Sequence, residues 1–276
     1  MDSQFIISTD LDGTLLDHHT YKYNKAVPAL EYCDEQNIPI IFNTSKTFSE
    51  TEKLCKQLDI IHPFIIENGS ALYIPKDYFP TIEDESVPCY DAGDYWLFKF
   101  GLNRNEILSR LVTFKSSHDF DYKGFSQYSS HELAKLTGLT LTQAIQAQER
   151  QFSEPINWLG TEEQLSDFRQ LISLFGLNAI KGGRFVHVQG KSDKSKPLMF
   201  LKSLYQRFHN TSQKLIALGD GDNDKDMLSC ADIAIVIKSP THERLIISEH
   251  KHLIRSKYIG PEGWNDSVMS LLEPVN

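Results

Sequence analysis

The chain has 276 residues, of which 40% are hydrophobic and 24% are charged, as in ordinary globular proteins with a sizeable core. Its formal net charge at pH 7 is −9 and it has no long basic run, which argues against nucleic acid or an anionic membrane surface as a partner. The four cysteines form no C-x-x-C pair and the N-terminus lacks the pattern of a signal peptide, so we expect a cytoplasmic protein.

Apolar runs and helical patterns alternate in the first part of the chain. This pattern predicts strands at 5–7, 38–42 and 63–66, and helices between them at 24–36 and 47–58. The dipeptide Asn68-Gly69 then turns the chain into a hairpin strand at 71–74. Because strands separated by helices pair in parallel through right-handed crossovers, we expect a parallel sheet with helices packed against it.

The pattern changes near residue 80. Residues 82–95 are acidic and irregular, so we expect a linker there. The aromatic stripe of Trp96, Phe98 and Phe100 is expected in the core of the unit that follows. We predict that this unit is α+β with antiparallel strands. Its predicted strands lie at 96–100, 155–159 and 184–188, and its predicted helices end near 115 and span 140–150 and 161–175.

The strand–helix pattern resumes in the last third of the chain, with predicted elements at 196–209, 215–218, 233–237 and 264–272. We therefore assign the chain to the α/β class. We expect a core formed by residues 1–83 and 191–276, interrupted by an inserted α+β unit at residues 84–190.

Three of the predicted strands end in polar side chains, which are Asp10 and Asp12, Thr44 and Ser45, and Asp220 and Asp224. Residues two apart in an extended chain point to the same side, so Asp10 and Asp12 can face one spot. Active sites of open parallel sheets lie beyond the carboxyl ends of the strands, so we expect these clusters in one crevice. Asp10, Asp12 and Asp220 could there hold one Mg²⁺, which prefers carboxylate ligands and retained waters.

Four short motifs follow one another along the chain: Asp10-Leu11-Asp12-Gly13-Thr14, Thr44 at a strand end, Lys194 before a helix, and Gly219-Asp220 with Asn223-Asp224. In this order, across roughly the whole chain, they resemble the motifs of phosphatases of the haloacid dehalogenase superfamily. The resemblance implies a Rossmann-like parallel-sheet core with an inserted type-2 cap. There are two departures, since Ser195 stands where a glycine is common and Asp222 where a small or neutral residue is usual.

The resemblance also implies a mechanism that uses Mg²⁺ and an aspartyl-phosphate intermediate. Asp10 would be the nucleophile, and Asp12 would protonate the leaving oxygen and then activate water. Thr44 would donate a hydrogen bond to the phosphoryl group, and Lys194 would supply positive charge to it.

The metal site is implied in the same way. Its members would be Asp10, Asp12 through its backbone carbonyl, Asp220 and Asp224. Of these, Asp220 would bind the metal directly, whereas Asp224 would more naturally orient the ligands or Lys194.

Further segments resemble the mannosyl-3-phosphoglycerate phosphatases: Thr44-Ser45-Lys46-Thr47, Glu67-Asn68-Gly69, the run 150–155, Gly182-Gly183-Arg184-Phe185 with His187, and the run 260–264. The substrate contacts that this resemblance implies are Ser45, Lys46, Asn68, Arg150, Glu154, Gly183, Arg184, His187 and Asn223. Arg184 with His187 is the candidate carboxylate site, because a guanidinium binds a carboxylate through two parallel hydrogen bonds.

Two further cap residues have implied roles, Arg150 for a carboxylate and Glu154 for sugar hydroxyls. For Lys46 the sequence leaves three partners open, the substrate, Asp12 and Glu67.

Three alternatives to a mannosyl-3-phosphoglycerate phosphatase remain open. The chain could act on another sugar phosphate, including glucosyl-3-phosphoglycerate, or it could be a phosphotransferase similar to phosphomannomutases. A non-catalytic binding protein is disfavoured, because a degenerate member of the superfamily usually loses the nucleophile or the metal carboxylates, and both are present here.

Overall fold

The structure is a computed structural model that describes residues 4–80, 82, 86–182, 184–209, 212–240 and 245–273. Its larger sheet has nine strands in the order β13-β12-β11-β1-β2-β3-β4-β6-β5. In chain order they are β1 (Phe5–Thr9), β2 (Ile40–Asn43), β3 (Phe64–Ile66), β4 (Ala71–Pro75), β5 (Cys89–Ala92), β6 (Tyr95–Lys99), β11 (Lys214–Gly219), β12 (Ile233–Lys238) and β13 (Leu253–Ile259).

The strands from β13 to β3 run parallel, and β4, β6 and β5 are antiparallel additions at one edge. The order of the strands reverses at β1, because the chain first builds outward through β2 and β3 and later returns to β11 on the other side. Such a switch point leaves a crevice at the carboxyl ends of the strands, and open α/β sheets bind their ligands there.

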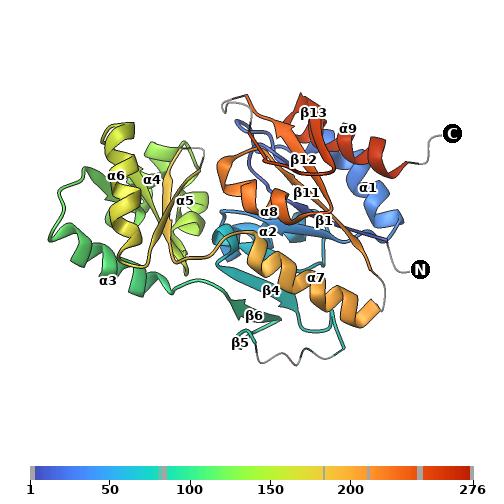
Figure 1. Ribbon diagram of the computed structural model, residues 1–276, viewed down its shortest axis with the longest axis horizontal. Helices are drawn as coiled ribbons and strands as arrows, with labels where there is room; N and C mark the ends of the chain where they lie inside the picture. The colour runs from blue at the N-terminus through green and yellow to red at the C-terminus, as the bar shows by residue number, and fades with distance from the viewer. Residues whose placement is uncertain are drawn as a thin grey trace.

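Helices cover both faces of this sheet (Figure 1). On one face lie α1 (Val27–Glu35), α2 (Phe48–Gln57) and α9 (Gly260–Leu272), and on the other lie α7 (Ser195–His209) and α8 (Lys225–Cys230). Neighbouring strand residues such as Ile6 and Ile7 belong to the two opposite hydrophobic clusters, as the alternation of side chains along a strand requires. Together these elements form what we call the core unit. None of the described helices is long and apolar enough to cross a membrane.

A smaller antiparallel sheet has the order β7-β8-β10-β9, with β7 (Tyr122–Gly124), β8 (Ser153–Trp158), β9 (Asn178–Lys181) and β10 (Val186–Gln189). Helices α3 (Arg104–Lys115) and α6 (Glu162–Ser173) pack on it through one hydrophobic cluster, and α4 (Ser130–Thr137) and α5 (Leu141–Gln148) form a second cluster with Phe125. We call α3 to β10 the inserted unit, which lies beside the core unit in Figure 1. Short 3₁₀ turns are η1 (Asn24–Ala26), η2 (Glu67–Gly69), η3 (Phe125–Gln127) and η4 (Asp222–Asp224).

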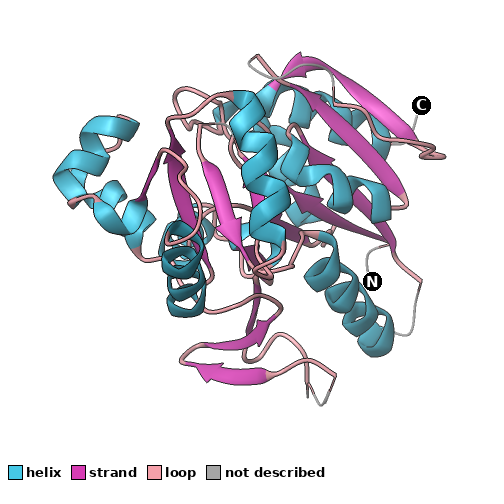
Figure 2. Cartoon of the chain, turned by 60° about the vertical axis from the view of Figure 1, so that its left-hand side comes forward, coloured by secondary structure: helices cyan, strands magenta, loops and turns pink. Residues whose placement is uncertain are grey.

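The predicted start of the inserted unit at residue 84 is too early. β5 and β6 form a hairpin that joins the larger sheet, because the antiparallel strand β4 offers a free edge with which β6 pairs (Figure 2). The stripe of Trp96, Phe98 and Phe100 therefore packs in the core unit, where the ring of Phe98 lies 5.1 Å from that of Phe200 on α7. The predicted linker contains β5, and the strands β7, β9 and β13 and the helix α4 were not predicted.

Candidate active site

The polar strand ends predicted from the sequence meet at one edge of the larger sheet. The strand β1 pairs in parallel with β2 on one side and with β11 on the other. The residues that directly follow these three strands are Asp10, Thr44 and Asp220. The backbone N–H of Asp10 donates to the carbonyl of Leu218 at 2.9 Å, which continues the ladder to the last residue before the turn. The parallel sheet thus fixes the backbone positions from which these side chains extend.

Three buried carboxylates converge at this edge. Oxygen atoms of Asp10, Asp220 and Asp224 all lie within 4.8 Å of one another. Burial and then the nearby Asp224 raise the pKa of Asp220 to about 7, and burial raises that of Asp10 although the charge of Lys194 opposes it. Oδ2 of Asp220 has no hydrogen-bond partner among the described residues. Crowded oxygens of this kind, one of them unsatisfied, fit a hard divalent cation such as Mg²⁺.

Lys194 joins two of these carboxylates. Its buried Nζ donates to Oδ1 of Asp10 and to Oδ1 of Asp224, both at 2.6 Å. Burial alone would lower the pKa of Lys194, but the two carboxylates raise it above its ordinary value. The second oxygen of Asp224 accepts the backbone N–H groups of Asp220 and Gly221, each at 3.0 Å. Asp224 is therefore engaged on both oxygens, which fits an orienting role.

Gly13 allows the turn after β1 to come close to Asp220. Its φ is +90°, a conformation that favours glycine, and a Cβ atom would lie 2.7 Å from Oδ2 of Asp220. The next residue, Thr14, donates to Oδ1 of the same carboxylate at 3.2 Å. The turn thus packs directly against the carboxylate cluster.

The carboxylate of Asp12 lies outside this cluster, in contrast to that of Asp10. Its Oδ2 accepts a hydrogen bond from Nζ of Lys46 at 2.8 Å. Of the three partners left open for Lys46 by the sequence, Asp12 is the one with which Lys46 pairs in the structure. Burial would lower the pKa of Lys46, but Asp12 and Glu50 raise it above its ordinary value. Asp12 remains a predicted metal ligand only through its backbone carbonyl.

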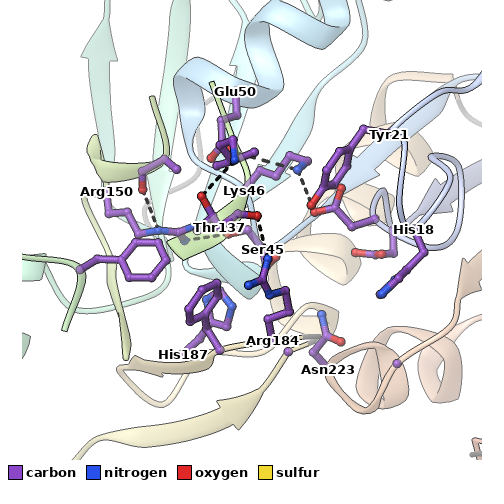
Figure 3. A pocket seen from close by; sticks show the side chains of 18 of the residues that line it. His18, Tyr21, Ser45, Lys46, Glu50, Thr137, Arg150, Arg184, His187 and Asn223 are labelled. Carbon is purple, nitrogen blue, oxygen red and sulfur yellow. Dashed lines mark hydrogen bonds and ion pairs between the residues drawn. The ribbon is translucent and has the colours of Figure 1, made fainter. Parts of the chain in front are cut away.

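A cavity of about 170 Å³ opens above the carboxylates, between the core unit and the inserted unit (Figure 3). The predicted site residues that line it are Asp10, Asp12, Ser45, Lys46, Arg150, Arg184, His187, Asp220 and Asn223. Of the other predicted residues, Thr44, Asn68, Lys194 and Asp224 are buried and do not line it, and Glu154 is described below. Asn68 is tied to the cavity wall, since its Oδ1 accepts a hydrogen bond from Nδ2 of Asn223 at 3.2 Å. Gly183 lies outside the described residues.

The inserted unit brings two arginines to the cavity (Figure 3). Nη1 of Arg150 donates to the carbonyl of Ser45 at 2.8 Å and so reaches the core unit. Arg184 is exposed and donates to the carbonyls of Leu136 and Thr137, both at 2.7 Å, near the C-terminal end of α4. Both guanidinium groups retain further N–H donors, because each has five.

His187 reaches the cavity from β10. It is buried, and its Nδ1 has no hydrogen-bond partner among the described residues. Burial, together with the positive charges of Arg150 and Lys194, lowers the pKa of His187 to about 3. The ring is therefore neutral at ordinary pH, and it can donate or accept a hydrogen bond without carrying charge.

Glu154 does not lie where the resemblance placed it. Its buried carboxylate accepts from Nε and Nη2 of Arg104, at 2.9 and 2.6 Å, and from the backbone N–H and hydroxyl of Ser126, both at 2.7 Å. It does not line the cavity. The predicted contact with sugar hydroxyls is thus wrong in this structure, because the carboxylate is already paired inside the inserted unit.

Four aromatic residues of the cavity were not predicted as site residues: His18 and Tyr21 from the loop after β1, and Phe125 and Phe185 from the inserted unit. His18 and Tyr21 come from the core unit. Tyr21 has a φ of +56° and lies with its ring 5.1 Å from Nζ of Lys46. The sequence had only a weak signal for His18 and Tyr21, a polar and aromatic run read as a loop. Tyrosine is not among the residue types that favour a positive φ, so no local pattern indicates this conformation.

Comparison with known proteins agrees with this geometry. A family model described as haloacid dehalogenase-like hydrolase matches residues 7–88 and 101–256. The residues between the two matched ranges carry the hairpin of β5 and β6. A glucosyl-3-phosphoglycerate/mannosyl-3-phosphoglycerate phosphatase of Methanococcoides burtonii is 40% identical over 275 residues, which is 98% of either chain. A phosphatase of the same name from Persephonella marina is 34% identical over 271 residues, again 98% of either chain.

Solved structures share the fold at lower identity. A protein of Thermoplasma acidophilum aligns with a TM-score of 0.67 and 15% identity over 96% of this chain and 97% of its own. A sucrose-phosphatase from Synechocystis, solved with sucrose and phosphate, aligns with a TM-score of 0.63 and 13% identity over 98% of both chains. The chain thus belongs to the haloacid dehalogenase-like hydrolases, in the same family as the two phosphatases named above, and is a phosphoric monoester hydrolase.

Proposed function

We propose that the chain is a Mg²⁺-dependent phosphatase that hydrolyses mannosyl-3-phosphoglycerate, or its glucosyl counterpart, to the glycosylglycerate and phosphate. The main support is the cavity itself. Its floor carries the carboxylates of Asp10, Asp12 and Asp220, and Lys194 lies buried behind that floor, bonded to Asp10. Its walls carry Arg150 and Arg184 from the inserted unit. The two relatives with 40% and 34% identity are named for these substrates.

In the proposed reaction, an oxygen of Asp10 attacks phosphorus and forms an aspartyl-phosphate, while the bond from phosphorus to the glycerate oxygen breaks. Asp12 gives its proton to that oxygen, and then takes a proton from the water that hydrolyses the aspartyl-phosphate. Lys194 stabilises the charge on the phosphoryl group, and Thr44 donates a hydrogen bond to it. Asp10, Asp220 and the backbone carbonyl of Asp12 would hold Mg²⁺, which supplies charge neutralisation at the phosphoryl oxygens.

Substrate selection is assigned to the inserted unit. A glycosyl-3-phosphoglycerate carries a carboxylate besides its phosphate, and the free N–H donors of Arg150 and Arg184 suit that group. His187, neutral and unpartnered at Nδ1, suits a hydroxyl or a carboxylate oxygen.

The four cysteines are free thiols, which agrees with the proposed cytoplasmic location.

The test is phosphate release from a panel of esters, with Mg²⁺ and with EDTA. We expect the highest kcat/KM for mannosyl- or glucosyl-3-phosphoglycerate, and no turnover in EDTA. Equal turnover of simple hexose phosphates with none for the glycosyl-3-phosphoglycerates would contradict the proposed substrate. Conversion of hexose 1-phosphate to 6-phosphate with little free phosphate would instead favour a phosphotransferase.

A further inference from the structure

Glu67 is a buried carboxylate that the proposed chemistry does not use. It directly follows β3, opens the 3₁₀ turn η2, and has an exposed fraction of 0%. Burial raises the pKa of Glu67, although the charge of Arg150 and several hydrogen bonds oppose that rise. Enclosing a carboxylate in this way is costly unless its oxygens are well paired. Its partners therefore indicate what it holds in place.

Among the described residues, the hydrogen-bond partners of its side chain all belong to one segment, which runs from the end of α5 into β8 in the inserted unit. Oε1 accepts the backbone N–H of Gln151 at 2.9 Å. Oε2 accepts the backbone N–H of Phe152 at 3.1 Å and the hydroxyl of Ser153 at 2.5 Å. A single side chain of the core unit thus fixes three consecutive residues of the inserted unit.

The same segment carries Arg150. Nη1 of Arg150 donates to Oγ of Ser153 at 3.2 Å, and that hydroxyl in turn donates to Glu67. On the core side, the backbone N–H of Glu67 donates to the carbonyl of Lys46 at 3.1 Å. Glu67 is therefore bonded both to the loop that carries the partner of Asp12 and to the segment that carries the cavity arginine.

The backbone at this point is strained. Glu67 has a φ of +47° and Asn68 one of +53°, so two consecutive non-glycine residues adopt the left-handed conformation. The left-handed conformation is unfavourable for a residue such as Glu67, and such strain persists only where surrounding contacts hold it. Such contacts are present here: the hydrogen bond from the backbone of Glu67 to Lys46, and those that its carboxylate accepts from residues 151–153.

We propose that Glu67 is a positioning residue, which holds Arg150 at a fixed place relative to the loop of Ser45 and Lys46 and thereby to the phosphate end of the substrate. The inference rests on the proposed function, because Arg150 is there assigned to the carboxylate of the substrate. It adds a specific link between the two units, through which the core sets the position of a group that selects the substrate.

The test is the variant Glu67→Gln, which removes the charge and places an NH₂ group where an oxygen now accepts N–H donors. We expect kcat/KM for the glycosyl-3-phosphoglycerate to fall by roughly 10- to 100-fold, mainly through KM, as for loss of a hydrogen bond to a charged group. Turnover of p-nitrophenyl phosphate, which has no carboxylate, should stay within about twofold of the wild type, because Asp10 and Lys194 are untouched.

A double-mutant cycle with Arg150→Ala supplies the readout that a merely structural role would not change. In the Arg150→Ala background, Glu67→Gln should add little further loss, because the group that it positions is absent. The matched control is Glu154→Gln. Glu154 is also buried and also accepts hydrogen bonds on both oxygens, but its partners Arg104 and Ser126 lie within the inserted unit and it does not line the cavity. Its variant should lower Tm without a selective loss for the carboxylate substrate.

Ser153→Ala provides a second route if Glu67→Gln folds poorly, since it removes only the hydroxyl between Arg150 and Glu67. Equal losses for both substrates, or fully additive losses in the double variant, would overturn the role of Glu67. A wild-type chain that hydrolyses some other ester but no glycosyl-3-phosphoglycerate would instead overturn the proposed function. The same cycle run with that ester would then decide whether Glu67 acts through Arg150.

Discussion

The floor and the walls of the cavity are built differently. On the floor, Asp10 and Asp220 follow the ends of paired parallel strands, and behind the floor Nζ of Lys194 lies 2.6 Å from an oxygen of Asp10 and from an oxygen of Asp224. On the walls, Arg184 is an exposed side chain that contacts carbonyl groups at the end of a short helix. Arg150, the other wall arginine, donates to the carbonyl of Ser45 in the core unit. The groups assigned to chemistry are thus fixed by the strand ends and by one another, whereas those assigned to selection depend on single contacts outside the sheet.

The largest effect is expected on the floor, from Asp10→Asn. A neutral amide is a poor nucleophile, so kcat should fall by about 10⁴-fold or more. Circular dichroism and substrate binding should change little, because Asn has the same shape as Asp. Turnover close to that of the wild type would show that another group attacks phosphorus.

A variant just behind the floor, Lys194→Met, should affect both catalysis and stability. It leaves Asp10 and Asp224 buried without their shared cation, which costs about 3–5 kcal/mol in the free energy of unfolding. Loss of the charge that faces the phosphoryl group should lower kcat by about 10²- to 10³-fold. Urea unfolding and phosphate release measure the two effects. Lys202→Met, which breaks the more exposed pair with Asp232, is the control and should cost less than about 1 kcal/mol.

On the walls, Arg150→Ala should raise KM for the glycosyl-3-phosphoglycerate by about 10- to 100-fold. Arg184→Ala should have a smaller effect, because Arg184 is exposed and water weakens its interactions with charged groups. Neither variant should change the turnover of p-nitrophenyl phosphate. If both variants lowered kcat for both substrates equally, the walls would share the chemistry and the distinction from the floor would fail.

Away from the cavity, at His62, no effect on activity is expected and only stability should change. Burial lowers the pKa of His62 to about 4, and its Nδ1 accepts the backbone N–H of Ile40 at 3.1 Å. As the pH falls below the unfolded-state pKa of about 6.5, the unfolded chain binds a proton that the folded chain does not. Stability should therefore fall by about 1.4 kcal/mol per pH unit from this group, until the pH reaches its folded pKa.

Urea unfolding of His62→Gln between pH 7 and pH 4.5 checks this expectation. The variant should lose that part of the pH dependence, so that its free energy of unfolding varies less steeply than that of the wild type. Parallel curves would mean that His62 is already solvated or charged in the folded chain.

The same contrast explains what the sequence could predict. The alternation of apolar runs and helices predicted the parallel strands, and the carboxylates of the floor followed because each comes directly after a strand. Lys194 lies 184 residues from Asp10, and only the resemblance to a known family linked the two. The clustering of Asp10, Asp220 and Asp224 agrees with the prediction made from their strand ends.

Predictions for the inserted unit were less accurate, for physical reasons. The role of Glu154 depended on Arg104, a partner 50 residues away that no local pattern indicates. The boundary near residue 84 was misplaced because a hairpin strand can pair with either sheet, and only packing decides which. Tyr21 and Glu67 were missed as site residues, because their roles depend on positive φ angles and on contacts distant in sequence.

The most direct test of the account compares two substrates that differ only in the carboxylate: glucosyl-3-phosphoglycerate and the corresponding glucosyl-glycerol phosphate. With Mg²⁺ present, we predict that wild-type kcat/KM is at least about 10-fold higher for the carboxylate substrate, and that Arg150→Ala removes most of this preference. Equal kcat/KM for the two esters in the wild type would contradict the claim that the walls of the cavity select a phosphoglycerate.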